Sequence, residues 1–210
     1  MEATAIAVRV SAAWKMALVV AFSVLALVRF TSDAQASGNP SPPNNGAGGL
    51  CEREIQSAAA KYGIPEGILY SVGLTETGRK GSLYPYALNV EGRPIFPPSE
   101  NAALQVFAAA RQNGAKLIDV GCMQINQYFH GENFTSVEAM FDPRSNVEYA
   151  AKFLRNLHDR HETWTMAVAR YHAGPNNDPA QKVYVCRVIA NLVATGYGKW
   201  TPNAATFCRN

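Results

Sequence analysis

The sequence carries little charge and has no dense run of Lys and Arg. Charged residues make up 17% of the 210 residues, and the formal net charge is +3. Nucleic-acid-binding proteins typically show clustered basic residues, so no nucleic-acid partner is expected. Hydrophobic residues reach 48%, which is too many for a disordered chain. The composition therefore predicts a well-packed globular domain.

The apolar run near the N-terminus is too short to cross a bilayer comfortably. It reads "MALVVAFSVLALV" over residues 16–28, whereas spanning takes roughly 20 apolar residues. Basic residues precede it, and the small-residue pattern "AQA" follows at 34–36, as in a secretory signal peptide. We therefore expect residues 1–36 to be a signal peptide cleaved after Ala36, and membrane contact to be confined to it. Arg29 leaves an uncleaved anchor as the alternative.

Cysteine is scarce, and neither a CxxC pair nor a His/Cys cluster is present. The sequence therefore predicts no metal site. Export favours disulfides for the four cysteines Cys51, Cys122, Cys186 and Cys208. Four cysteines allow three pairings. We favour Cys51–Cys122, from the first helix to the central strand, and Cys186–Cys208, from the last helix to the tail, although the spacing alone does not decide.

Composition and periodicity divide the remaining chain. Residues 37–49, "SGNPSPPNNGAGG", contain turn-forming and small residues and predict a flexible linker. A domain is expected over 50–200 and a C-terminal tail over 201–210. Apolar spacing predicts helices near 51–62, 65–76, 99–112, from 143 onward, from 164 onward and 179–195. Strands are expected at 86–90, 93–96 and 116–126, the first two joined by a Glu91-Gly92 turn.

The second predicted helix ends with an acid on its apolar stripe. In "ILYSVGLTETGRKG", residues 68–81, Glu76 follows Val72 by four residues and so lies on the same face. A partly desolvated carboxyl has a raised pKa and can donate a proton near neutral pH. The alternative is a Glu76 turned to solvent, or paired with Arg79 or Lys80. The predicted helices and strands together indicate a mostly helical, lysozyme-like α+β domain with a small antiparallel sheet. Glu76 falls at the junction of helix and sheet, where a cleft is expected.

Three short motifs occur in order, each at the boundary of a predicted element. They are "TETG" (75–78), "GCMQIN" (121–126) and "AVARYHAG" (167–174). Together they resemble the soluble lytic transglycosylase family, over about residues 50–200. That family has a lysozyme-like domain and cleaves the glycan strands of peptidoglycan. The resemblance implies a periplasmic enzyme with peptidoglycan as substrate and no cofactor.

The resemblance also implies roles for single residues. Glu76 matches the family's catalytic Glu, and Gly121 and Gly174 match glycines of structural use. Substrate contacts are expected from Thr77, Met123, Gln124, Asn126, Tyr171 and His172. Two of these depart from the family, which has Ser at the position of Thr77 and Asn at that of His172. Met123 can equally be a core residue, and Tyr128 and Phe129 either line a sugar subsite or pack.

The mechanism implied by the resemblance uses one carboxyl group twice. Glu76 would protonate the oxygen linking N-acetylmuramic acid to N-acetylglucosamine. It would then take the proton of the muramic-acid C6 hydroxyl as that oxygen attacks C1, which gives a 1,6-anhydro sugar. Tyr171 would orient Glu76 or steady the positive sugar.

Two other functions stay open. Asp119 lies on the predicted strand with the parity of Gly121 and Met123, so it could point toward the cleft. Facing Glu76, it would make the chain a hydrolytic muramidase; otherwise it is an Asp at the strand edge, paired to a base. The departures at Thr77 and His172 also allow a non-catalytic wall-binding assembly factor. The long segment between Glu76 and Gly121 resembles the specialised members that open the wall for flagella or secretion machines.

Overall fold

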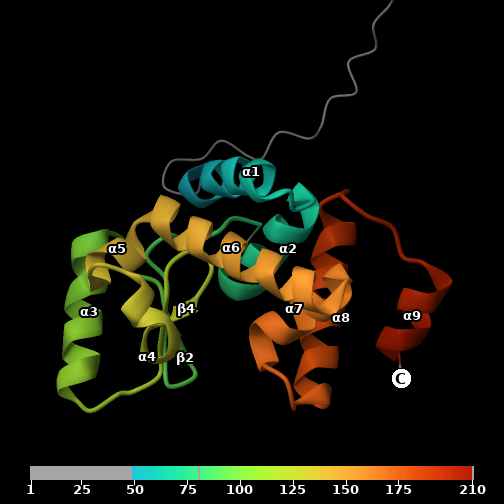
Figure 1. The fold of residues 1–210 in the computed structure, drawn as a ribbon. Coiled ribbons are helices and arrows are strands. Elements are labelled where there is room, and N and C mark those ends of the chain that lie inside the picture. Colours follow the sequence, from blue (N-terminus) through green and yellow to red (C-terminus); the bar gives the residue numbers. More distant parts are fainter. Residues whose placement is uncertain (1–48, 80, 210) are drawn as a thin grey trace, which may run out of the picture. The chain divides into compact units, whose positions relative to one another are not determined.

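The computed structural model describes residues 49–79 and 81–209. The predicted signal peptide, its cleavage site and nearly all of the predicted linker lie outside these residues. The helices are α1 (Leu50–Tyr62), α2 (Glu66–Thr77), α3 (Glu100–Gln112), α4 (Gln127–His130), α5 (Val137–Phe141), α6 (Pro143–His161), α7 (Trp164–Ala173), α8 (Asp178–Ala194) and α9 (Pro202–Arg209), and η2 (Gly131–Asn133) is a single 3-10 turn. The strands are β1 (Leu88–Val90), β2 (Arg93–Ile95), β3 (Ile118–Val120) and β4 (Ile125–Asn126). Figure 1 shows their order along the chain.

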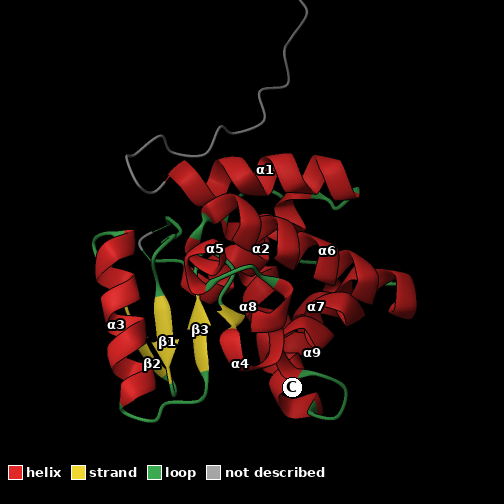
Figure 2. Ribbon diagram, turned by 60° about the vertical axis from the view of Figure 1, so that its left-hand side comes forward, coloured by secondary structure: helices red, strands yellow, loops and turns green. Residues whose placement is uncertain are grey.

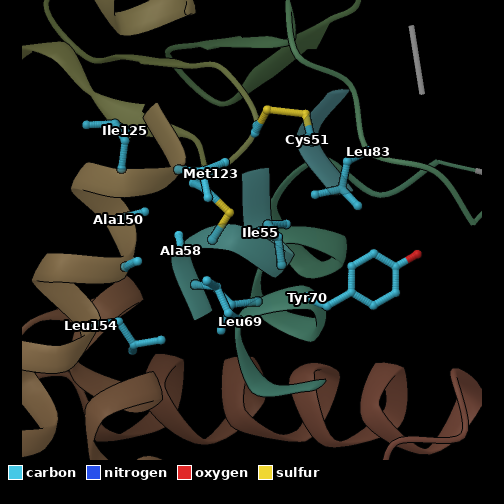
Figure 3. Close-up of a cluster of buried hydrophobic side chains, with 14 of the residues drawn as sticks. Cys51, Ile55, Ala58, Leu69, Tyr70, Leu83, Met123, Ile125, Ala150 and Leu154 are labelled. Atoms are coloured by element: carbon cyan, nitrogen blue, oxygen red, sulfur yellow. A yellow bond between two sulfur atoms is a disulfide. The ribbon is translucent and has the colours of Figure 1, made fainter. Parts of the chain in front are cut away.

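The helices pack around α2, which ends at the junction with the sheet. α1 packs on α2 and α6, while α8 packs on α2 and α7. The apolar stripe that predicted α1 is buried, and the helix ends at Gly63, whose φ of 62° is left-handed. Figure 3 shows Ile55 and Ala58 of α1 near Leu69 of α2, in a buried cluster that also includes Leu154 of α6. The predicted mostly helical α+β fold is confirmed.

The four strands form one antiparallel sheet in the order β2-β1-β3-β4. The predicted hairpin is confirmed, because Glu91 and Gly92 turn the chain with positive φ values of 50° and 84°. α3 lies along the hairpin side of this sheet, and the other helices gather beyond β3 and β4 (Figure 2). The sheet thus forms one wall beside the end of α2.

The prediction of one continuous strand over 116–126 is wrong. The chain turns at Gly121–Gln124, with φ values of 80° and 47° at these two residues, and β4 folds back antiparallel to β3. Alternation of Ile118 and Val120 marks only β3. Beyond Gly121 the strand parity used to place side chains no longer applies.

Asn146 of α6 holds this turn. Its Oδ1 accepts a hydrogen bond from the Met123 amide at 2.8 Å, and its Nδ2 donates to the carbonyls of Val120 at 3.0 Å and Met140 at 2.9 Å. A Cβ at Gly121 would lie 2.4 Å from Asn146 Nδ2, so a larger residue would push the Asn146 amide out of these hydrogen bonds. Gly121 therefore has the expected structural role, since only glycine lets the turn approach Asn146.

Both favoured disulfides are present. Cys51–Cys122 joins α1 to the turn, and Cys186–Cys208 joins α8 to α9. The segment predicted as a tail, 201–210, thus contains a helix, which Thr201 caps by accepting from the Ala204 amide. In the part of the chain that the structure describes, no helix has both the length and the apolar character of a membrane span.

Candidate active site

Glu76 occupies the last turn of α2 and faces a pocket. Its side chain is 13% exposed, so the alternative of a Glu turned to solvent is wrong. The pocket has a volume of about 280 Å³ and is lined by Glu76, Asn89, Asp119, Gln124, Ile125, Asn126, Phe129, His130, Phe153, Tyr171 and His172. A groove of about 480 Å³ between β2 and α3 is larger. The carboxylate that lines this groove, Glu91, accepts hydrogen bonds from the backbone amides of Lys116 and Leu117, just before β3. The Glu76 pocket is therefore the better candidate.

The environment of Glu76 keeps a proton on it near neutral pH. Burial raises its pKa from 4.5 to about 7, and the nearby Asp119 contributes in the same direction. The Tyr184 hydroxyl opposes this by donating a hydrogen bond to Oε1 at 2.5 Å. A carboxyl that is half protonated near pH 7 can both give and accept a proton. These are the properties of a general acid and base.

Asp119 also lines this pocket, on β3. Its Oδ1 accepts a hydrogen bond from Asn126 Nδ2 at 2.7 Å, so among the described residues its partner is an amide and not the base of the alternative. Burial raises the pKa of Asp119, although the Asn126 hydrogen bond opposes that rise. The site therefore brings two desolvated carboxyl groups to one pocket.

Gln124 of the turn and Asn126 of β4 line the pocket together. Gln124 Nε2 donates to the carbonyls of Ala87 at 3.2 Å and Gly121 at 3.1 Å. Asn126 is engaged at both ends of its amide, because its Oδ1 accepts the amides at the start of α4. Both residues face the pocket as expected, but their amide nitrogens already have protein partners.

The end of α7 supplies Tyr171 and His172. The Tyr171 hydroxyl donates to the Met123 carbonyl at 3.0 Å, so Tyr171 fixes the turn and does not orient Glu76 directly. His172 is 49% exposed, and its Nδ1 lies 4.0 Å from Glu76 Oε1. Its ring stacks on that of Tyr184 at 4.3 Å and 2°. Burial and the Arg187 charge lower the pKa of His172, which favours its neutral form at neutral pH.

Comparison with family models gives a match to the transglycosylase SLT domain over residues 53–185. The chain belongs to this family. The match covers more than half of the sequence and includes Glu76, the turn and both aromatic residues that hold them, Tyr171 and Tyr184. Membership implies transglycosylase activity on peptidoglycan. Comparisons with curated proteins and with solved structures found no match.

Two residues of the SLT motifs do not reach the pocket. Met123 is fully buried, and its side chain points into the core with Ile55 and Ala58 (Figure 3). Thr77 is buried too, and its hydroxyl donates to the Cys122 carbonyl at 3.0 Å. The expectation that Met123 and Thr77 contact substrate is therefore corrected, because the turn directs both inward. Thr77 joins α2 to the turn instead.

The remaining SLT motif glycine, Gly174, follows α7 with a φ of 61°. A residue with a side chain would be strained in this left-handed conformation. The Gly174 carbonyl accepts a hydrogen bond from Gln181 Nε2 at 2.6 Å, which links the end of α7 to α8. This position is structural, as expected.

Sequence reasoning missed Tyr184, Asn89, His130 and Phe153. Tyr184 is 3% exposed on the buried face of α8, so its periodicity indicates a core residue and nothing marks its hydroxyl. Asn89 carried a usable signal, since it lies between the inward Leu88 and Val90 on the opposite face of β1. Asn89 Oδ1 is buried and accepts no hydrogen bond from any described residue. It is therefore free to accept one from a bound sugar.

Among the residues with described positions, no three His, Cys, Asp or Glu side chains are grouped as metal ligands.

Proposed function

We propose that this chain is a peptidoglycan lytic transglycosylase with Glu76 as its single general acid and base. The observation that supports this most is the state of Glu76: a carboxyl with a pKa of about 7, held by Tyr184 in a sugar-sized pocket. The substrate bond joins C1 of N-acetylmuramic acid to O4 of N-acetylglucosamine. The SLT family match supports this choice of substrate.

The reaction proceeds by two proton transfers at one carboxyl group. Protonated Glu76 donates its proton to the bridging O4, and the C1–O4 bond breaks with its electron pair on oxygen. The resulting Glu76 carboxylate takes the proton from the C6 hydroxyl of the same muramic acid, and O6 bonds to C1. Glu76 ends protonated as it began, and no water is consumed. A positioned acid of this kind contributes about 10²–10⁴-fold to the rate.

The pocket walls have complementary tasks in this proposal. Charged Asp119 would stabilise the positive charge that develops at C1, and its hydrogen bond to Asn126 holds it there. Asn89 Oδ1 would accept the N–H of an N-acetyl group, because it is buried without a partner among the described residues. His172 and Gln124 also line the pocket.

A hydrolytic muramidase is the second candidate, and the presence of Asp119 in the pocket favours it. A second carboxylate can activate water or act as nucleophile in glycoside hydrolysis. Digestion of purified sacculi in heavy-oxygen water, followed by mass spectrometry, separates the two. Anhydro ends without heavy oxygen support the lyase. Reducing muramic-acid ends that carry heavy oxygen would refute it in favour of the hydrolase.

Variants then assign the carboxyl groups. Glu76→Gln should abolish cleavage of the glycan strand while sacculus binding persists. The amide keeps the shape of the side chain but cannot donate a proton to the bridging oxygen. Asp119→Asn should lower kcat and still give anhydro ends. Glu54→Gln, on α1 outside the pocket, is the matched control and should behave as wild type. Full cleaving activity in Glu76→Gln would refute the assignment of Glu76. Sacculus binding without any cleavage by the wild-type chain would instead support the non-catalytic wall-binding role.

We also propose that the enzyme acts in the periplasm on behalf of a flagellum or secretion apparatus. The pattern of residues 1–36 supports export, and the segment between Glu76 and Gly121, which folds into the β1–β2 hairpin and α3, supports a specialised role. Cell fractionation with N-terminal sequencing of the mature chain tests the first point. Loss of assembly in a Glu76→Gln strain, with growth unchanged, tests the second.

A further inference from the structure

Two neighbouring aromatic side chains of α4 are exposed beside the catalytic pocket. Tyr128 is 62% exposed and Phe129 is 63% exposed. Their rings meet edge to face, with centroids 5.0 Å apart and an interplanar angle of 88°. Phe129 also lines the pocket that contains Glu76. Contiguous exposed apolar surface of this kind commonly marks a binding site.

The start of α4 is fixed to the pocket by one residue. Asn126 Oδ1 accepts hydrogen bonds from the Tyr128 amide at 3.0 Å and the Phe129 amide at 3.3 Å. Nδ2 of the same Asn126 donates to Asp119 at 2.7 Å. The two aromatic rings therefore have a defined position relative to the pocket carboxylates.

The end of α4 is fixed as well. His130 Nδ1 is 2.8 Å from the Tyr149 hydroxyl, and the His130 ring packs on those of Tyr149 and Phe153. Because both ends are held, the exposure of Tyr128 and Phe129 is not the result of a loose segment. A rigid, preformed surface loses little conformational entropy when a ligand binds.

The chemistry of this surface fits a sugar ring. A pyranose in a β-1,4-linked strand has apolar C–H faces that pack on aromatic rings and polar edges that stay hydrated. Tyr128 and Phe129 offer such a face without a formal charge, and the Tyr hydroxyl adds a polar tip. The surface is continuous with the pocket through Phe129, and a polymeric substrate must continue past the pocket.

We propose that Tyr128 and Phe129 form a further saccharide subsite, which binds one ring of the glycan strand beyond the sugars held at Glu76. The identity of the strand rests on the proposed function. The subsite makes long strands better substrates than short fragments, because only a long strand covers both the pocket and α4.

Binding is best measured in the full-length chain carrying Glu76→Gln, so that the strand is not cleaved. The probe is peptide-free glycan strands released from sacculi by amidase, with affinity measured by calorimetry. Replacing both Tyr128 and Phe129 with Ala should weaken binding about tenfold, which corresponds to about 1.4 kcal/mol. Replacing both with Trp should preserve it. Phe207→Ala is the matched control, because Phe207 is an aromatic of α9 that is 45% exposed.

The outcomes separate clearly. Loss of affinity with Ala, recovery with Trp and no change in the control support the subsite. Equal affinity in the double Ala variant, or the same loss in Phe207→Ala, overturns it. In the cleaving enzyme the Ala changes should raise KM for long strands with little effect on kcat. If wild-type protein releases no cleaved product, the proposed function fails, whereas the binding comparison still decides whether the subsite exists.

Discussion

Replacing Glu76 with Gln should stabilise the fold at alkaline pH and leave its stability nearly unchanged at acid pH. The pKa of Glu76 is about 7 in the folded chain, against an ordinary value of 4.5. Burial causes this rise, because the pocket disfavours the charged carboxylate. Glutamine keeps the size of the side chain and an oxygen that can accept from Tyr184, but it never becomes charged.

The magnitude follows from the two pKa values. Below pH 4.5 Glu76 is protonated in both the folded and the unfolded chain, so it contributes no pH dependence. Between 4.5 and 7 the unfolded chain loses its proton first, and the free energy of unfolding falls by about 1.4 kcal/mol per pH unit. Above pH 7 the fall in the free energy of unfolding is complete and amounts to about 3 kcal/mol. The stability advantage of Glu76→Gln should therefore grow to about 3 kcal/mol over this window.

Urea unfolding of both chains at about pH 4, 6 and 8 measures this difference. Other titrating groups act equally on the two chains and cancel, except those that face Glu76. Asp119 and His172 are such groups, so the comparison is repeated with Asp119→Asn and with His172→Asn in both chains. Glu54→Gln, on α1 outside the pocket, is the control for a general effect of replacing Glu with Gln. An advantage of Glu76→Gln that stays constant from acid to alkaline pH would refute the reasoning that burial keeps Glu76 protonated.

Three further outcomes test the site and its supports. Tyr184→Phe removes the hydrogen bond that stabilises charged Glu76, so the pKa of Glu76 should rise. The alkaline limb of the pH–rate profile should then shift to higher pH by about one unit; an unchanged limb contradicts this. Asn146→Ala leaves three backbone groups unpaired and should lower the free energy of unfolding by about 3 kcal/mol in urea titrations. Replacing Cys51 and Cys122 together with Ala should lower it by about 4 kcal/mol, because the disulfide closes a loop between residues 71 positions apart; thermal unfolding under oxidising conditions checks the loss.

Local patterns in the sequence predicted the elements that determine the site. The apolar stripes gave the positions of α1 and α2, and with them the place of Glu76 at the end of a buried face. Glu91-Gly92 predicted the hairpin, and both residues have positive φ in the structure. The positions of the predicted elements favour Cys51–Cys122 and Cys186–Cys208, and the structure confirms both pairings.

What escaped prediction depends on contacts between distant segments. The turn at Gly121 is held by Asn146 from another helix, and no local pattern shows that Met123 then points into the core. Tyr184 reaches Glu76 across 108 positions of sequence, and its neighbours in α8 mark it only as buried. Short helices such as α4 have too few residues to show a periodicity, so the exposed position of Tyr128 and Phe129 came only from the structure.

The Cys51–Cys122 bond has a consequence for when the enzyme can be active. It ties the first helix of the domain to the turn that carries Gln124 and leads into Asn126 of β4. The bond forms only where an oxidant is available. A newly made chain in a reducing compartment holds that turn by non-covalent contacts alone. Oxidation of this cysteine pair therefore completes the support of the pocket wall only in a compartment that supplies an oxidant.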